Sequence, residues 1–385
     1  MPACVSCLIP AAASCASGAL EQVIDCPNGL REALSLLPDP RCRRGRRHQV
    51  ATVLTVAVAG ILAGARSYEG IWAWAVDLPG SIKAGLGIRG RVPCESTIRR
   101  VVQSVDADLL DAVVCAWAAA RQGDSRSPRA IAIDGKSARG ARRGDGSRVH
   151  LMAALDHDTG TVLGQVQVGS KSSEINAFRP LLDRINITGS IVTADALHTQ
   201  RGHVNYLRRH GGHYVFTVKT NQPRLHTQLA TLPWTSIPVA DTNTGKGHGR
   251  VETRTLKLTT VAAGIGFPGA KLAAQLTRTR RPLASQTTST ETVYAVTDLG
   301  YDDITPSALA AVIRGHWSIE NRLHWVRDTT FAEDHSQVRT GHGPQVMATL
   351  RNLAVSLHRH SGAVNIAAAA RAIAHRPERV LALVT

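Results

Sequence analysis

The N-terminal part of the chain has the hydrophobic pattern of a helical domain. Residues 31–122 are rich in Ala and Val, and their longest apolar run extends from Val50 to Ala65. This run has two threonines and two glycines, and it is shorter than the about 20 residues that a membrane-spanning helix needs. We therefore predict a helical N-terminal domain in which the run is a buried core helix, with a disordered leader over residues 1–30 before it.

From Arg129 the apolar residues change to the short runs and alternation typical of β-strands. Strands are predicted at residues 130–134, 150–155, 161–168, 190–195 and 213–219. Two amphipathic helices, at residues 173–185 and 199–210, separate the last three strands. This order resembles the ribonuclease H-like fold, in which the first and fourth strands lie side by side and parallel. We predict an α/β fold with a mixed sheet, the first part of which spans residues 129–221.

A segment of different composition interrupts the predicted sheet. Residues 222–290 are rich in Thr, Gly and Arg and contain short alternating stretches, so they predict a β-rich insertion. The strand pattern resumes at residues 292–299, and a helix follows from Ser307 to about Arg327. We assign these two elements to the second part of the core, residues 291–343. The tail at residues 344–385 predicts C-terminal helices.

The charge of the chain indicates which kind of molecule the protein binds. There are 45 Lys and Arg residues against 29 Asp and Glu residues, which gives a net charge of +16 and a pI near 10.3. Such a balance is typical of proteins that bind phosphates, although ribosomal and membrane-surface proteins share it. The cysteines number 7, an odd count in a long chain, which fits a reducing compartment rather than a disulfide framework.

Three carboxylates stand out against this basic background. Asp134 and Asp195 each end an apolar run, and they are predicted at the adjacent C-terminal ends of the first and fourth strands. Glu320 lies on the later helix, between His316 and His324. Phosphodiester chemistry often uses two Mg²⁺ ions, which prefer hard oxygen ligands such as these carboxylates. The alternative of a zinc protease is rejected, because its motif requires two histidines four residues apart.

Several motifs together resemble the DDE transposases of the ISAs family of bacterial insertion sequences. They are Ile133-Asp134-Gly135-Lys136, Thr193-Ala194-Asp195-Ala196, Val218-Lys219-Thr220-Asn221-Gln222-Pro223, Gly247-His248-Gly249-Arg250 with Glu252 and Arg254, and His316-Trp317-Ser318-Ile319-Glu320-Asn321 with Leu323-His324-Trp325 and Phe331-Ala332-Glu333-Asp334. The resemblance implies a ribonuclease H-like core with a β insertion before the glutamate. It also implies Mg²⁺-dependent DNA cleavage and strand transfer at the ends of the element.

By this resemblance Asp134, Asp195 and Glu320 are the catalytic, metal-binding triad for two Mg²⁺ ions, for which Mn²⁺ substitutes. The partners implied are double-stranded DNA, both the terminal inverted repeats and the target, and a second copy of the chain when two ends are paired. A bacterial protein of the cytoplasm, associated with the nucleoid and not with a membrane, is expected. Related transposases carry Tyr, Arg and Lys at fixed positions around the glutamate, where this chain has Ile313, His316 and Arg327.

The remaining candidate residues are expected to contact DNA. They are Lys136, Lys219, Asn221, Arg250, Arg254, His316, Trp317, Asn321 and Arg327 in the core and insertion, and Arg99 and Arg100 in a short N-terminal helix that resembles a recognition helix. For the arginine pair the alternative is a solvated helix end, and for Trp317 or Trp325 it is core packing. The alternative for the whole chain is a catalytically silent DNA-binding protein derived from a transposase.

Overall fold

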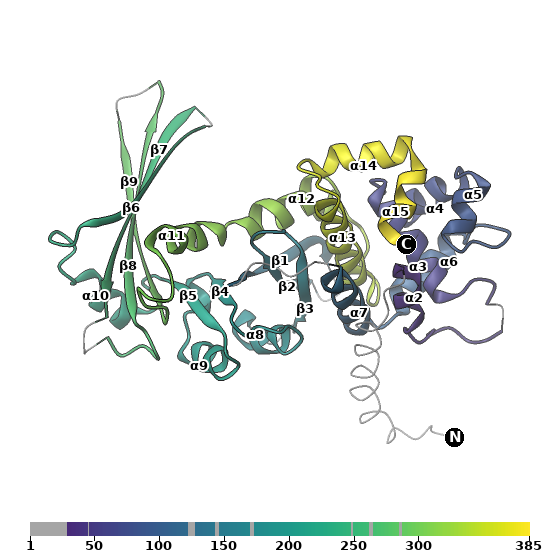
Figure 1. Ribbon diagram of the computed structural model, residues 1–385. Coiled ribbons are helices and arrows are strands. Elements are labelled where there is room, and N and C mark those ends of the chain that lie inside the picture. The colour runs from purple at the N-terminus through teal and green to yellow at the C-terminus, as the bar shows by residue number, and fades with distance from the viewer. Residues whose placement is uncertain are drawn as a thin grey trace, which may run out of the picture.

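A nine-stranded mixed sheet forms the middle and one end of the molecule, and a helical domain forms the other end (Figure 1). The computed structural model describes residues 29–44, 46–121, 128–142, 146–169, 173–247, 249–261, 265–284 and 287–385. The strands lie in the order β3-β2-β1-β4-β5-β9-β8-β7-β6. The predicted α/β class with a mixed sheet is confirmed. The predicted leader lies almost entirely outside the described residues.

The first five strands form the predicted core. They are β1 (Ala130–Arg142), β2 (Arg148–Asp156), β3 (Val162–Val168), β4 (Ile191–Ala194) and β5 (His213–Val218). The first three form an antiparallel meander, whereas β4 pairs parallel with both β1 and β5. Helices α8 (Glu174–Leu182) and α9 (Arg201–Arg209) cover one face and bury Phe178 and Leu207 against it. The predicted adjacency of the first and fourth strands is therefore confirmed.

The insertion extends this sheet instead of forming a separate one. Its strands are β6 (Val239–Gly247), β7 (Arg250–Thr260) and β8 (Leu272–Pro282), and β9 (Ser289–Thr297) follows them. Strand β9 pairs antiparallel with β5, with Phe216 opposite Val296, and β8 then pairs with β9. The predicted β-rich character is confirmed. A short helix that the composition did not indicate, α10 (Pro223–Ala230), begins with its proline in the first turn, where the missing N–H costs nothing.

The helical domain is assembled from both ends of the chain. Its N-terminal helices are α2 (Leu30–Ser35), α3 (Val50–Leu62), α4 (Tyr68–Val76), α5 (Gly80–Gly85), α6 (Glu95–Ser104) and α7 (Ala107–Ala120). Every residue of α3 is buried, as predicted for the long apolar run. Helix α13 (Gly343–His360) packs against α3 and α7, and α14 (Ile366–His375) and α15 (Leu381–Val384) close the same core. Among the described residues, no helix is long and apolar enough to cross a membrane.

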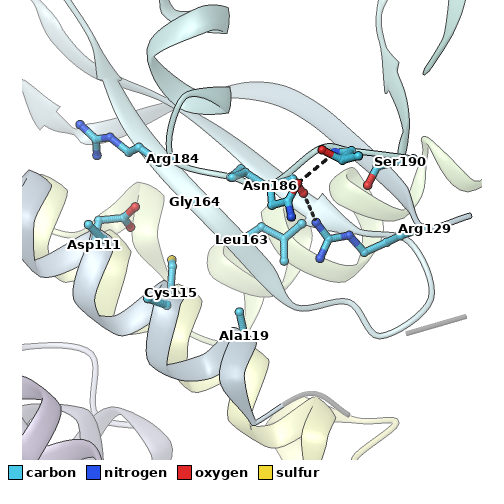
Figure 2. A pocket seen from close by; sticks show the side chains of 14 residues that line it. Asp111, Cys115, Ala119, Arg129, Leu163, Gly164, Arg184, Asn186 and Ser190 are labelled. Carbon is cyan, nitrogen blue, oxygen red and sulfur yellow. Dashed lines mark hydrogen bonds between the residues drawn. The ribbon is translucent and has the colours of Figure 1, made fainter. Parts of the chain in front are cut away.

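Polar side chains join this helical domain to the sheet. The fully buried carboxylate of Asp111 on α7 accepts from the backbone N–H of Gln165 on β3 at 2.7 Å and from the hydroxyl of Thr349 on α13 at 3.1 Å. Burial raises the pKa of Asp111 to about 7. Asp111, Cys115 and Arg184 line a cavity of about 360 Å³. Figure 2 shows these side chains around it.

Candidate active site

The two aspartates are brought together by the register of the parallel strands. Strands β1 and β4 pair along four positions, and the last pair is Ile133 with Ala194. Asp134 and Asp195 are the next residues, so they lie as neighbours where this parallel pairing ends. The predicted strand end at Asp134 is wrong, because β1 stays paired with β2 and continues to Arg142. Asp134 accepts from the N–H of Gly135 at 2.8 Å. Asp195 caps a short 3₁₀ turn by accepting from the N–H of Leu197 at 3.0 Å, which fixes its carboxylate beyond the strand end.

Glu320 comes to this edge on a helical segment with an unusual turn. Helix α11 (Pro306–Gly315) begins at the N-cap Thr305, whose hydroxyl accepts from the N–H of Ala308. After a break, Glu320–His324 forms a π-helical turn that runs into α12 (Trp325–Thr329). Ile319 and Leu323 anchor this turn in the core while Glu320 keeps its side chain 55% exposed. Single π turns in helices are frequent at functional sites, because they change which side chains face one direction.

His324 connects the glutamate to the sheet. Its Nδ1 lies 3.0 Å from Oε2 of Glu320 and 3.5 Å from Oδ2 of Asp134, and its ring is buried. Among the described residues, Asp134, Glu320 and His324 offer ligand atoms that all lie within 4.8 Å of one another, as a metal site requires. The sequence pattern placed His324 one turn after Glu320 but did not assign it to the site. The i, i+4 spacing of two polar residues was the available signal.

The electrostatics of the site are those of crowded carboxylates. Burial raises the pKa of Asp134, and the neighbouring charges of Glu320 and Asp195 raise it further against the opposing effect of His324. The hydrogen bond from His324 lowers the pKa of Glu320. The carboxylate oxygens of Asp134 and Glu320 are donors that suit Mg²⁺ or Mn²⁺, because a divalent cation offsets their mutual repulsion. Asp195 lies outside this group of ligand atoms, although its charge acts on Asp134.

Arg327, expected at the DNA surface, lies in the core instead. Its side chain is fully buried, its Nε donates to Glu333 at 2.8 Å, and a terminal nitrogen of its guanidinium lies 2.7 Å from the same carboxylate oxygen. Arg351 on α13 donates to the other oxygen of Glu333 at 3.0 Å. Although burial alone would raise it, the pKa of Glu333 falls to about 2 because the two arginines outweigh burial. With no exposed atom, Arg327 cannot reach DNA in this conformation, and its role here is to anchor the helix that carries Glu320.

His316 is also directed inward. Its Nδ1 lies 3.1 Å from the hydroxyl of Thr193 on β4, and Nε2 of His157 lies 3.0 Å from the same hydroxyl. Burial lowers the pKa of His316 to about 4, so the ring is neutral at physiological pH. A hydrogen bond from His316 to DNA, as expected from the sequence, would therefore come from an uncharged ring. The contact that the structure shows is between the helix and the sheet.

Lys136 is paired within the protein as well. Its ammonium lies 2.7 Å from Asp328 and 3.8 Å from Asp334, and its side chain is 10% exposed. Phosphate contact by Lys136 would require it to leave these two carboxylates. Trp317 and Trp325, by contrast, are 59% and 60% exposed. Core packing of either tryptophan, weighed from the sequence, is therefore wrong.

The other expected DNA contacts lie on four different elements. Lys219 and Asn221 are exposed after β5, and the Asn221 amide donates to the carbonyl of Ala196 at 2.7 Å, next to Asp195. Asn321 is exposed on the π turn. Arg99 and Arg100 are exposed on α6, where Arg99 lies 3.5 Å from Glu95. Arg250 and Arg254 lie on β7 beside Glu252.

The cavity of Figure 2 lies at the opposite edge of the sheet from the carboxylates. Arg129 and Ser190, which line it, directly precede β1 and β4, whereas Asp134 and Asp195 directly follow the last paired positions of these two strands. Because β1 and β4 are parallel, their two ends point to opposite edges. The cavity is therefore not the candidate active site, although it is well formed. The carboxylates occupy an open surface, which suits a polymeric substrate better than a small molecule.

Comparisons with known proteins identify the family of the chain. Residues 125–357 match the family described as "Transposase DDE domain", and residues 31–118 match the family described as "DDE_Tnp_1-associated". The chain is 28% identical over 350 residues to "Putative protein YbfL" of Escherichia coli (strain K12), covering 85% of this chain and 89% of that protein. It is 27% identical over 350 residues to "H repeat-associated putative transposase YhhI" of the same strain, with the same coverage.

A search of solved structures finds a weaker likeness. A chain described as piggyBac transposase, in a synaptic complex with hairpin DNA, aligns with a TM-score of 0.45 and 9% sequence identity. The alignment covers 95% of this chain and 81% of that one.

Proposed function

The chain belongs to the transposase DDE domain family, and we propose that it cuts DNA at the ends of an insertion sequence and joins them to target DNA. One observation carries this proposal: Asp134 and Asp195 follow the last paired positions of two parallel strands, and Glu320 is held near Asp134 through His324. Two carboxylates from neighbouring strands and a third from a packed helix can serve metal-dependent phosphodiester chemistry.

We propose that Asp134, Asp195 and Glu320 hold two Mg²⁺ ions, with Mn²⁺ able to replace them. When bound, such ions lower the pKa of a water molecule and neutralise charge on the entering and leaving oxygens of the phosphodiester. The chain itself provides the fixed ligand positions. The hydrogen bond that Asp134 accepts within β1, the turn capped by Asp195 and the anchored π turn at Glu320 hold the three carboxylates before substrate arrives, which reduces the entropic cost of assembling the site.

The substrate is proposed to be double-stranded DNA, in the form of terminal inverted repeats and a target. The net charge of +16 favours a polyanion, and exposed Trp317, Asn321 and Lys219 surround the open edge on which the carboxylates lie. Aromatic faces can stack on bases that leave the duplex. Joining two ends in one reaction requires two copies of the site, so we propose that the protein forms a homodimer on paired ends. We propose that it acts in the bacterial cytoplasm, at the nucleoid.

Cleavage of a labelled duplex that carries the repeat flanking the gene tests this function. With Mg²⁺ or Mn²⁺ we expect the protein to release a defined end and then a joined product. Asp134→Asn, Asp195→Asn and Glu320→Gln should each abolish both products while keeping DNA affinity within about twofold, because they remove ligands and not phosphate contacts. Asp302→Asn, which changes an exposed carboxylate away from the site, is the matched control and should cut normally.

Other outcomes identify other functions. Cleavage by the three variants at the parent rate would refute the assignment of the triad. Binding without cleavage by the parent protein, in both metals, would instead indicate a catalytically silent DNA-binding protein. Cleavage without a joined product would indicate a nuclease.

A further inference from the structure

A cluster of arginines covers one face of the insertion sheet. Arg250 and Arg254 alternate with Glu252 along β7, so all three point to the same face. In the neighbouring strand β8, Arg280 pairs with Glu252 and Arg278 pairs with Arg254. All four guanidinium groups approach the single carboxylate of Glu252: Arg278 at 2.8 Å, Arg280 at 3.4 Å, Arg250 at 3.7 Å, and Arg254 in direct contact.

This arginine face adjoins the helix that leads to the active site. Arg314, on α11, donates to Asn243 on β6 at 3.3 Å, and a cavity of about 330 Å³ lies between α11 and strands β6 to β9. Leu256, Leu276 and Val293 form part of its floor. Figure 1 shows α11 running from the insertion strands toward α12 over the core sheet. The face and Glu320 are therefore connected through α11 and the π turn that follows it after the break at residues 316 and 317.

The charges on this face are not balanced within the protein. Five guanidinium groups, including that of Arg314, surround the carboxylates of Glu252, Glu291 and Asp241. Within the described part of the chain, the Nε atoms of Arg278 and Arg280 are buried and have no hydrogen-bond partner. The repulsion is visible in Arg254, whose pKa is lowered by burial first and then by the charges of Arg278, Arg314 and Arg280, against the opposing effect of Glu252. The guanidinium groups are partly exposed, so an external polyanion could offset the excess of positive charge on this face.

We propose that this arginine face, formed by Arg250, Arg254, Arg278, Arg280 and Arg314, binds the sugar-phosphate backbone of duplex DNA close to the scissile bond. The inference rests on the proposed function for its substrate. Arg314 precedes Glu320 by six positions, which is about 9 Å along a helix axis at 1.5 Å per residue. With a rise of about 3.4 Å per base pair, a phosphate held by Arg314 would lie roughly three base pairs from one at Glu320. Planar guanidinium groups match phosphate oxygens in pairs, so arginine suits this role better than lysine.

Salt dependence of DNA binding tests the proposal, because each phosphate contact adds close to one to the slope of log affinity against log salt. The probe is a fluorescent 30-base-pair duplex of arbitrary sequence, followed by anisotropy. Arg254→Gln, Arg280→Gln and Arg314→Gln should each reduce the slope by about 1 and weaken binding about fivefold near 0.15 M salt. The matched control is Arg209→Gln, because Arg209 is an exposed arginine on α9, on the opposite face of the sheet.

The choice of variants distinguishes a loss of DNA binding from a loss of folding. Removing one arginine beside Glu252 leaves three, and Arg314 contacts Asn243 rather than Glu252, so Arg314→Gln tests the face even if a β-strand variant fails to fold. Slopes and affinities equal to those of the parent and of Arg209→Gln would overturn the proposal. Asp134→Asn separates it from the proposed catalytic function: that variant should lose cleavage and keep the full slope. Cleavage retained by Asp134→Asn, with slopes still reduced by the arginine variants, would refute the triad but not the arginine face.

Discussion

The Nδ1 atom of His324 lies 3.0 Å from the Glu320 carboxylate, one turn earlier on the helix, and 3.5 Å from the Asp134 carboxylate on the sheet. One imidazole thus connects two carboxylates that are 186 positions apart in the sequence. Imidazole is a weaker partner than oxygen for Mg²⁺, so His324 is best placed to orient the carboxylates by hydrogen bonding. We regard it as a positioning residue.

Replacing His324 should weaken metal binding without removing any carboxylate. We expect His324→Ala to reduce Mn²⁺ affinity by roughly tenfold, the scale typical of residues that orient metal ligands. His324→Gln, which can still donate a hydrogen bond, should recover most of the loss. Isothermal titration of the DNA-free protein with Mn²⁺ measures both. Equal affinity in the alanine variant and the parent would show that His324 has no part in the site.

Glu333 should be essential to the fold even though it does not belong to the proposed catalytic triad. Glu333→Gln leaves Arg327 and Arg351 buried without a countercharge, which costs about 3 to 5 kcal/mol of unfolding free energy. Urea unfolding measures the loss. Because the pKa of Glu333 is about 2 rather than its ordinary 4.5, its contribution is complete above pH 4.5 and is lost as pH falls toward 2. The difference between parent and variant should therefore shrink in acid.

An exposed glutamate provides the comparison for this prediction. Glu291→Gln removes a carboxylate that is 54% exposed and 3.2 Å from Arg280, and such surface pairs contribute roughly 0 to 1 kcal/mol. Losses of similar size in the two variants would contradict the buried role assigned to Glu333.

Asp111 should make the protein less stable as pH rises toward neutrality. Its pKa is about 7 in the folded state against an ordinary value of 3.8, so between these values the folded state holds a proton that the unfolded state releases. The unfolding free energy then falls with rising pH, by at most about 1.4 kcal/mol per unit. We expect Asp111→Asn to flatten the decline in melting temperature between pH 5 and pH 8. A variant that follows the parent across this range would contradict the prediction.

Gly135, next to Asp134, should not tolerate a side chain. A Cβ atom at this position would lie 2.5 Å from the Glu174 carboxylate and 2.7 Å from Nε2 of His150, which form an ion pair at 2.6 Å. Gly135→Ala must therefore displace β1 or this pair, and we expect cleavage to fall at least tenfold with DNA affinity kept. Gly245→Ala, on β6, meets no atom within 4 Å and is the control. Normal cleavage by Gly135→Ala would show that the strand end adapts.

The local patterns of the sequence determined the elements and the principal carboxylates. Short apolar runs ending in Asp134 and Asp195 predicted the paired parts of β1 and β4, and the strand order brought the two aspartates together, because the strands run parallel. The continuation of β1 to Arg142 was not predicted, because this part of the strand is polar. The apolar run that forms α3 was also correctly predicted to be a buried helix, because a helix that is apolar on all sides must be buried. The charge of +16 indicated a polyanionic partner before any fold was known.

Only the tertiary structure decided which polar groups face inward and which segments share a core. Arg327 and Lys136 were expected from the sequence to bind DNA. In the structure, Arg327 pairs with Glu333, and Lys136 pairs with Asp328 and Asp334. Periodicity gives the face of an element on which a charge lies, but the partner of a buried charge comes from distant parts of the chain. For the same reason, the sequence did not predict that α13 packs against the N-terminal helices or that β9 pairs with β5 to extend the core sheet. Both depend on long-range packing, which short-range patterns do not encode.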